Sequence, residues 1–123
     1  MNVLETKKAP GAIGPYSQGY EVNGFVFTSG QIAIDPATGS IDAQTVEEQT
    51  HQALRNLQAV LEAAGTGTDK VIKTTCFLKH MSDFAAFNAV YAQYFLNKPA
   101  RSCVEVGALP KDALVEVEAV AEL

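Results

Sequence analysis

The segment Leu114-Val115-Glu116-Val117-Glu118-Ala119-Val120-Ala121 decides the fold of this chain, because apolar and charged residues alternate along most of it. This two-residue period is typical of a β-strand that buries one face. The apolar face carries Val115, Val117, Ala119 and Ala121, and the opposite face carries Glu116 and Glu118. A sheet with one apolar face needs a second layer to cover it, so the segment predicts helices on that side.

Turn and capping signals place the elements that come before this strand. Asn23-Gly24 predicts a type I′ hairpin between two short strands. Thr45, with Glu48 three residues later, forms a capping box at the start of a helix. Apolar residues then recur at helical spacing until Gly65, which is predicted to end the helix.

A second helix and further strands follow from the same rules. Ser82 is predicted to cap a helix from Asp83 to about Leu96. Its apolar face comprises Phe84, Phe87, Tyr91 and Phe95. Strands are expected at 20–22, 25–29, 31–34, 71–79, 102–106 and 114–121. The resulting order, β-β-(β)-α-β-α-β-β, indicates an α+β fold.

Length and composition bound the classes of function. The 123 residues, 47% of them hydrophobic, suit a single domain over residues 1–123. A formal net charge of −5 and the lack of a basic stripe disfavour nucleic-acid and anionic-membrane partners. Cys76 and Cys103 have no C-x-x-C spacing, and no apolar run resembles a leader or a membrane span. We therefore expect a cytoplasmic protein with reduced thiols.

The polar faces of the last two strands hold the candidate chemistry. Arg101, Cys103 and Glu105 share one face of their strand, and we expect that face to join Glu116 and Glu118 on a single side of the sheet. Two interpretations stay open. The side can be an ordinary solvated face. Alternatively, the arginine holds a substrate carboxylate while a glutamate positions a water molecule.

Other polar residues give weaker signals. Asn88 lies at the edge of the apolar face of the second helix, where its amide belongs either to a buried polar network or to a site. Gly65-Thr66-Gly67-Thr68 follows a helix, whereas phosphate loops precede one. Glu47 and His51 lie one helical turn apart, but two ligands do not make a metal site. We therefore expect no metal ligands.

Several longer motifs are similar to those of the reactive-intermediate deaminase (Rid, YjgF-like) family. They are Gly14-Pro15-Tyr16-Ser17-Gln18, Thr28-Ser29-Gly30-Gln31, Lys73-Thr74-Thr75, Pro99-Ala100-Arg101-Ser102-Cys103-Val104-Glu105-Val106, Leu109-Pro110-Lys111-Asp112 and Val115-Glu116-Val117-Glu118-Ala119. The resemblance runs from about Ala9 to Ala121, so it covers nearly the whole chain.

The resemblance implies a chorismate-mutase-like α+β protomer, with a mixed sheet and two helices on one face. It also implies a homotrimer with a central β-barrel and with sites in the clefts between subunits. The implied site residues are Arg101, which would bind the substrate carboxylate, Glu116, which would orient the attacking water, and Tyr16, Ser29, Gly30, Asn88 and Cys103, which would bind the substrate. Tyr16 would act across the interface, and Cys103 is a lining residue because no histidine is linked to it by a motif.

The implied activity is hydrolysis of 2-imino or enamino acids, such as 2-aminoacrylate, 2-iminopropanoate and 2-iminobutanoate, to 2-oxo acids and ammonia. A protonated imine is already electrophilic, so no metal or organic cofactor is required. Gly107-Ala108 and the short link 96–98 depart from the family pattern and bear on substrate size. Two alternatives remain, a trimeric regulator that binds 2-oxo acids without turnover and, disfavoured by the acidic charge, a ribonuclease.

Overall fold

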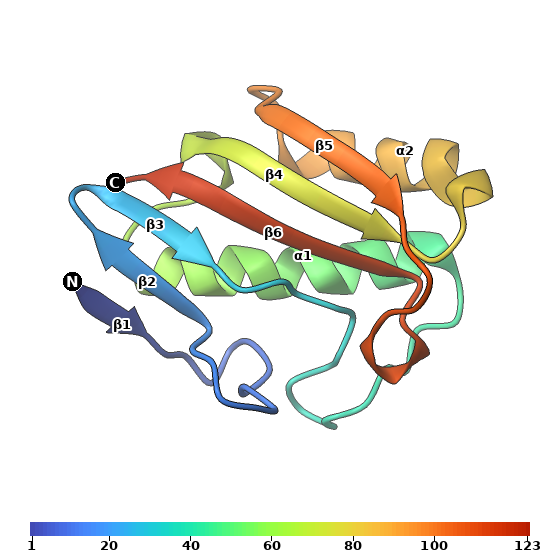
Figure 1. Ribbon diagram of the computed structural model, residues 1–123, viewed down its shortest axis with the longest axis horizontal. Coiled ribbons are helices and arrows are strands. Elements are labelled where there is room, and N and C mark those ends of the chain that lie inside the picture. Colours follow the sequence, from blue (N-terminus) through green and yellow to red (C-terminus); the bar gives the residue numbers. More distant parts are fainter.

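A six-stranded sheet organises the chain, and the computed structural model describes all residues from 1 to 123. The strands are β1 (Asn2–Leu4), β2 (Gly19–Val22), β3 (Phe25–Thr28), β4 (Val71–Leu78), β5 (Ala100–Glu105) and β6 (Val115–Glu122). They lie in the order β1-β2-β3-β6-β4-β5, and only the β4–β5 pair is parallel (Figure 1). The mixed sheet that the sequence led us to expect is confirmed.

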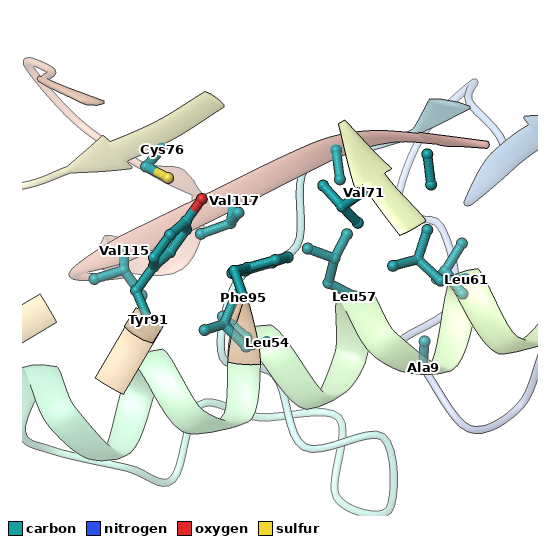
Figure 2. Close-up of a cluster of buried hydrophobic side chains, with 14 of the residues drawn as sticks. Ala9, Leu54, Leu57, Leu61, Val71, Cys76, Tyr91, Phe95, Val115 and Val117 are labelled. Atoms are coloured by element: carbon teal, nitrogen blue, oxygen red, sulfur yellow. The ribbon is translucent and has the colours of Figure 1, made fainter. Parts of the chain in front are cut away.

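Both helices, α1 (Val46–Ala63) and α2 (Phe84–Tyr94), pack on the same face of this sheet. Leu54, Leu57 and Leu61 of α1 meet the inward side chains of β6 in a single apolar cluster (Figure 2). The four residues of β6 assigned to the apolar face are all buried, namely Val115, Val117, Ala119 and Ala121. Neither helix has the length and apolar character that crossing a lipid bilayer requires.

The hairpin and the first helix form as their local signals predict. Asn23 and Gly24 have φ angles of 52° and 82°, the left-handed values that a type I′ turn requires. At the start of α1, the Thr45 hydroxyl oxygen accepts the Glu48 N–H at 3.2 Å and donates to the Glu48 carboxylate at 3.0 Å. Gly65, with φ of 83°, ends the helix after Ala64.

The strand expected at 31–34 is wrong, because only Gln31 makes a bridge, to Val117 of β6. The carbonyls of Ile32 and Ile34 instead accept two hydrogen bonds from the buried Asn56 amide of α1, at 3.0 and 2.8 Å. A side chain therefore satisfies the acceptors that a neighbouring strand would otherwise bind. The sequence prediction also missed β1, which is only three residues long.

The N-cap assigned to Ser82 is also wrong. Ser82 lies inside a 3₁₀ turn, Met81–Asp83, and α2 begins at Phe84 with no side-chain hydrogen bond from its N-cap residue. The turn is held from outside the helix, because the Glu105 carboxylate of β5 accepts the Met81 N–H at 2.7 Å. A residue distant in sequence thus replaces the local cap.

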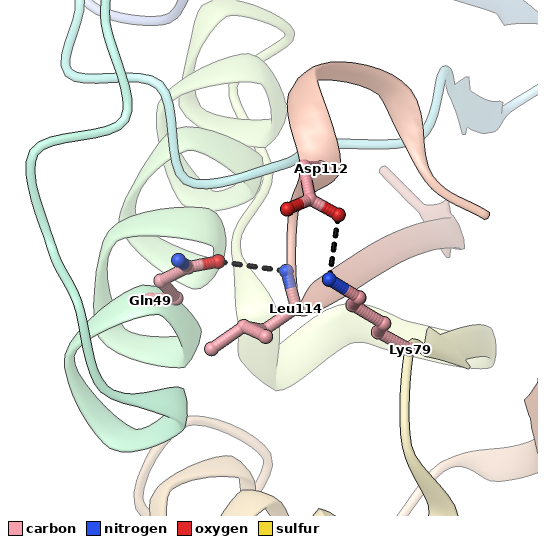
Figure 3. Close-up of polar contacts among 4 residues, drawn as sticks. All are labelled: Gln49, Lys79, Asp112 and Leu114. Carbon is pink, nitrogen blue, oxygen red and sulfur yellow. Dashed lines mark hydrogen bonds and ion pairs between the residues drawn. The ribbon is translucent and has the colours of Figure 1, made fainter.

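Two polar contacts fix the loop that leads into β6 (Figure 3). The Gln49 side chain of α1 accepts the Leu114 N–H at 2.9 Å, and Lys79 pairs with Asp112 at 2.6 Å. The contact to Lys79 is made by the last residue of the 3₁₀ turn Pro110–Asp112, and the contact to Gln49 is made two residues later. They set the position at which β6 starts, one residue before Glu116.

Asn56 offers a test of this account of residues 31–34. Asn56→Asp keeps the shape but removes the donor for two carbonyls, so we expect the free energy of unfolding to fall by about 3 kcal/mol. Gln93→Glu, the same amide-to-acid change on the exposed side of α2, should cost less than about 0.5 kcal/mol. Urea denaturation measures both, and equal small losses would contradict the role of Asn56.

Candidate active site

The strand register separates the residues that the sequence analysis placed on one side of the sheet. Cys103 of β5 lies opposite Cys76 of β4, which lies opposite the buried Val117 of β6. Residues that are directly opposite share a face, so Cys103 points to the helix-covered side. Arg101 and Glu105 have the same parity along β5 and point the same way.

The glutamates of β6 point to the other, open side. Glu116 lies opposite Phe77 of β4, which lies opposite Val104 of β5, and Glu118 follows with the same parity. The expectation that Arg101, Cys103, Glu105, Glu116 and Glu118 share one side is therefore wrong. Alternation fixes the two faces of each strand, but β4 lies between β5 and β6, and its register sets which faces match.

Arg101 and Glu116 are consequently far apart within one chain. Arg101 pairs with Thr74 and Glu116 with Phe77, three residues further along β4. Two strand spacings and three residues of extended chain separate their Cα atoms by about 14 Å, with the sheet between the side chains. We call the group Arg101, Asn88 and Cys103 the arginine half-site, and the group Glu116, Gly30, Ser29 and Tyr16 the glutamate half-site.

The arginine half-site holds a half-buried cation without an acidic partner. Arg101 Nη1 donates to Asn88 Oδ1 at 2.8 Å, which gives the Asn88 amide a definite partner. The guanidinium carbon lies 4.8 Å from the ring centroid of Tyr91 and 5.5 Å from that of Phe84. No carboxylate pairs with it, since the one ion pair in the structure joins a lysine and an aspartate elsewhere.

A groove of about 440 Å³ runs beside this cation. It is lined by Asn88, Tyr91, Ala92, Phe95, Leu96, Lys98, Pro99 and Arg101. Apart from Asn88, Lys98 and Arg101, these side chains are mostly apolar. Such a groove suits a small molecule that carries a negative group at one end and a hydrocarbon part at the other.

Cys103 completes this half-site as a neutral thiol. Burial raises its pKa, and the nearby Arg101 charge opposes that rise only in part. Burial also raises the pKa of the neighbouring Cys76 to about 12. Because both thiols stay protonated near neutral pH, this supports the interpretation of Cys103 as a lining residue rather than a thiolate nucleophile.

The glutamate half-site lies on the open face, where Glu116 packs against the backbone of Gly30. A Cβ atom on Gly30 would come within 2.7 Å of Glu116 Oε2, so a larger residue there would force the carboxylate out of its present position. Tyr16 and Pro110 border the same small recess. The hydroxyl of Ser29 donates to the Ser17 carbonyl at 2.5 Å, which anchors the loop beside Gly30.

The environment of Glu116 raises its pKa and so makes it a weaker acid. Burial raises its pKa, and the negative charge of Glu118, on the same face of β6, raises it further. A carboxylate with a raised pKa is a better proton acceptor when it is ionised. Glu116 is thus suited to general-base chemistry, although it is not beside Arg101 in the single chain.

Three residues that support the half-sites were not among the predicted site residues. Phe84 and Tyr91 were assigned to the apolar face of α2, yet both contact Arg101. Their spacing from Asn88, four residues before and three after, was the signal that places all three on one helix face. Buried Gln18 hydrogen-bonds the backbone at Thr6, Ala9 and Pro10, and so holds the segment that leads to Tyr16.

Comparisons with known proteins identify the family of this chain. A family model described as endoribonuclease L-PSP matches residues 6–123. The 2-iminobutanoate/2-iminopropanoate deaminase of Salmonella typhimurium is 48% identical over 122 residues, which cover 96% of this chain and 94% of that protein. The putative regulator AldR of Lactococcus lactis is 48% identical over 124 residues, which cover 100% of this chain and 98% of that protein.

Among solved structures, E. coli TdcF with bound serine superposes with a TM-score of 0.95 at 46% sequence identity, covering 100% of this chain and 99% of that chain. Matches of this length and identity show that the chain belongs to the endoribonuclease L-PSP family, and they confirm its resemblance to the Rid, YjgF-like proteins.

Proposed function

We propose that the protein is a cofactor-independent hydrolase that converts 2-imino or enamino acids to 2-oxo acids and ammonia. The observation that carries the proposal is the Arg101 guanidinium, which is oriented by Asn88 and two aromatic rings and has no acidic partner. Its planar N–H donors match a carboxylate with two parallel hydrogen bonds. A relative with 48% identity is named as a deaminase of two such imino acids.

The apolar groove beside Arg101 supports small aliphatic substrates. With the carboxylate bound to Arg101, the hydrocarbon part of 2-iminopropanoate or 2-iminobutanoate lies over Ala92, Phe95 and Leu96. The solved relative TdcF contains bound serine, which also carries a carboxylate next to a nitrogen-bearing carbon. This common chemistry favours, as the ligand, a carboxylic acid that carries a nitrogen substituent on its α-carbon.

The complete site forms between copies of the chain in this proposal. The open face of the sheet exposes large apolar side chains to solvent, which is energetically unfavourable. They are Tyr20, Phe25, Phe27 and Val104. A homotrimer with the open faces lining a central β-barrel would cover them. It would also bring the arginine half-site of one subunit to the glutamate half-site of the next, with Tyr16 acting across the interface.

The proposed reaction needs only these groups. The protonated imine carbon is electrophilic, and an enamine reaches the same form by taking a proton on its β-carbon. Glu116 orients a water molecule and accepts one of its protons as the water oxygen bonds to the imine carbon. Glu116 then gives this proton to the nitrogen and accepts the remaining proton of the carbinol oxygen as the C–N bond breaks and the carbonyl forms. Ammonia takes up that proton and leaves together with the 2-oxo acid.

A second candidate function is a trimeric regulator that binds 2-oxo acids without turnover, because one relative is named as a putative regulator. The arginine half-site would serve either role, so turnover distinguishes them. The family description also names an endoribonuclease, but the net charge of −5 weighs against binding a polyanion.

Replacing Arg101, the residue proposed to bind the substrate carboxylate, tests the deaminase proposal. An amino-acid oxidase or a dehydratase generates the imino acid, and 2-oxo acid formation is followed with and without the protein. Arg101→Lys keeps the charge but loses the bidentate geometry, so we expect kcat/KM to fall at least about 100-fold. Full activity in this variant, or no acceleration by a well-folded wild-type protein, would refute the proposal.

The pH dependence of kcat/KM tests the role of Glu116. Because its pKa is raised, we expect kcat/KM to fall as the pH drops through a midpoint above that of an ordinary glutamate. Glu118→Gln removes a neighbouring negative charge, so it should move this acidic limb to lower pH. Glu116→Gln should abolish turnover while light scattering shows an unchanged oligomer, and an active Glu116→Gln variant would exclude the general-base role.

Gly30 should be intolerant of a side chain. In Gly30→Ala the new methyl group would displace the Glu116 carboxylate, so we expect kcat to fall about tenfold or more with the fold retained. Gly107→Ala is the matched control, because a Cβ there meets no atom within 4 Å. Steady-state kinetics and circular dichroism of both variants check this, and equal activities would contradict it.

A further inference from the structure

Three side chains on one face of α2 contact the Arg101 guanidinium. Phe84, Asn88 and Tyr91 lie four and three residues apart, so their side chains project from the same side of the helix. All three contact Arg101, at 5.5 Å, 2.8 Å and 4.8 Å respectively. Asn88 occupies one N–H group, and the guanidinium carbon lies over the two aromatic rings.

Tyr91 is itself held rigidly in place. Its hydroxyl lies 2.6 Å from the Thr74 hydroxyl of β4, and both residues are buried, with 8% and 0% of their surfaces exposed. Figure 2 shows the ring standing between α2 and the sheet, with its oxygen directed toward the sheet near Cys76. The Phe95 ring packs against it at a centroid distance of 4.5 Å.

Thr74 links the strand that carries Arg101 to the side chain of Tyr91. It is the direct register partner of Arg101 on the neighbouring strand, and its side chain binds the tyrosine that contacts the arginine. The backbone position of Arg101 and the position of the Tyr91 ring are therefore both set by one residue of β4. The tyrosine cannot shift without breaking a buried hydrogen bond, which is costly to leave unmade.

We propose that Tyr91 is a positioning residue, whose ring, locked by Thr74, orients the Arg101 guanidinium for a substrate carboxylate. The inference rests on the proposed function, in which Arg101 is the carboxylate clamp. A free arginine side chain samples many rotamers, and binding would have to order it. A ring fixed in advance removes most of that ordering cost and leaves the donor edge open toward the groove.

The Tyr91 hydroxyl does not serve as an acid in this arrangement. It is engaged with Thr74 on the sheet side, away from the groove that Arg101 borders. Burial also raises the Tyr91 pKa, so the hydroxyl stays neutral. The ring and not the hydroxyl is thus the part that acts on Arg101, through a cation–π contact.

The test compares Tyr91→Leu, Tyr91→Phe and Thr74→Val in the full chain. The affinity for 2-oxobutanoate is measured by calorimetry, together with kcat/KM for the imino acid and the melting temperature. Tyr91→Leu should raise Kd about tenfold and lower kcat/KM at least as much. Tyr91→Phe keeps the ring but removes the hydrogen bond to Thr74, so it should raise Kd only about threefold, and Thr74→Val should give the same intermediate value.

Phe87→Leu provides the matched control. Phe87 is fully buried on the same helix and packs against Tyr91, but it does not contact Arg101. This variant should lower the melting temperature as much as Tyr91→Leu does while leaving Kd unchanged. Wild-type affinity in Tyr91→Leu, or an equal loss of affinity in Phe87→Leu, would overturn the positioning role.

These outcomes are separable from failure of the proposed function. If the wild-type protein binds 2-oxobutanoate in a Tyr91-dependent way but hydrolyses no imino acid, the deaminase proposal fails and the positioning role stands. If imino acids are hydrolysed in an Arg101-dependent way while Tyr91→Leu retains wild-type Kd and kcat/KM, the positioning role fails and the deaminase proposal stands.

Discussion

The register of three neighbouring strands is the constraint on which the rest of the structure depends. Because β4 lies between β5 and β6, one row of opposite residues runs Cys103, Cys76 and Val117, and the next runs Val104, Phe77 and Glu116. The first row faces the helices and the second faces outward. A slip of one residue in the β4–β6 ladder would turn Glu116 into the core and Val117 outward, and a slip in the β4–β5 ladder would turn Arg101 away from α2.

This constraint explains why each half of the site is supported by a different layer. The helix layer orients the arginine, because α2 supplies an amide and two rings to a residue that emerges on its side of the sheet. On the open side, the close approach of Gly30 and the anchored loop around Ser29 shape the surroundings of the glutamate. A single sheet thus holds two groups that its own chain cannot bring together, and in the proposed homotrimer a second copy would supply what each lacks.

The sequence predicted the parts that local chemistry determines. The Asn23-Gly24 turn, the Thr45 cap and the alternation along β6 each depend on a few adjacent residues, and all three formed as expected. Contacts between distant residues account for the errors. Asn56 replaced a strand partner for residues 31–34, Glu105 replaced the Ser82 cap, and the β4 register separated Arg101 from Glu116. The candidate residues were identified by motif, whereas their distribution over two faces required the fold.

Subunit complementation tests the shared site most directly. Arg101→Ala and Glu116→Ala chains, each inactive alone, are unfolded together at equal amounts and refolded, and mixed trimers are verified by native mass spectrometry. If the arginine comes from one subunit and the glutamate from the next, every mixed trimer contains one intact site, and random mixing restores about a quarter of wild-type activity. A verified population of mixed trimers that stays as inactive as its parents would contradict the account.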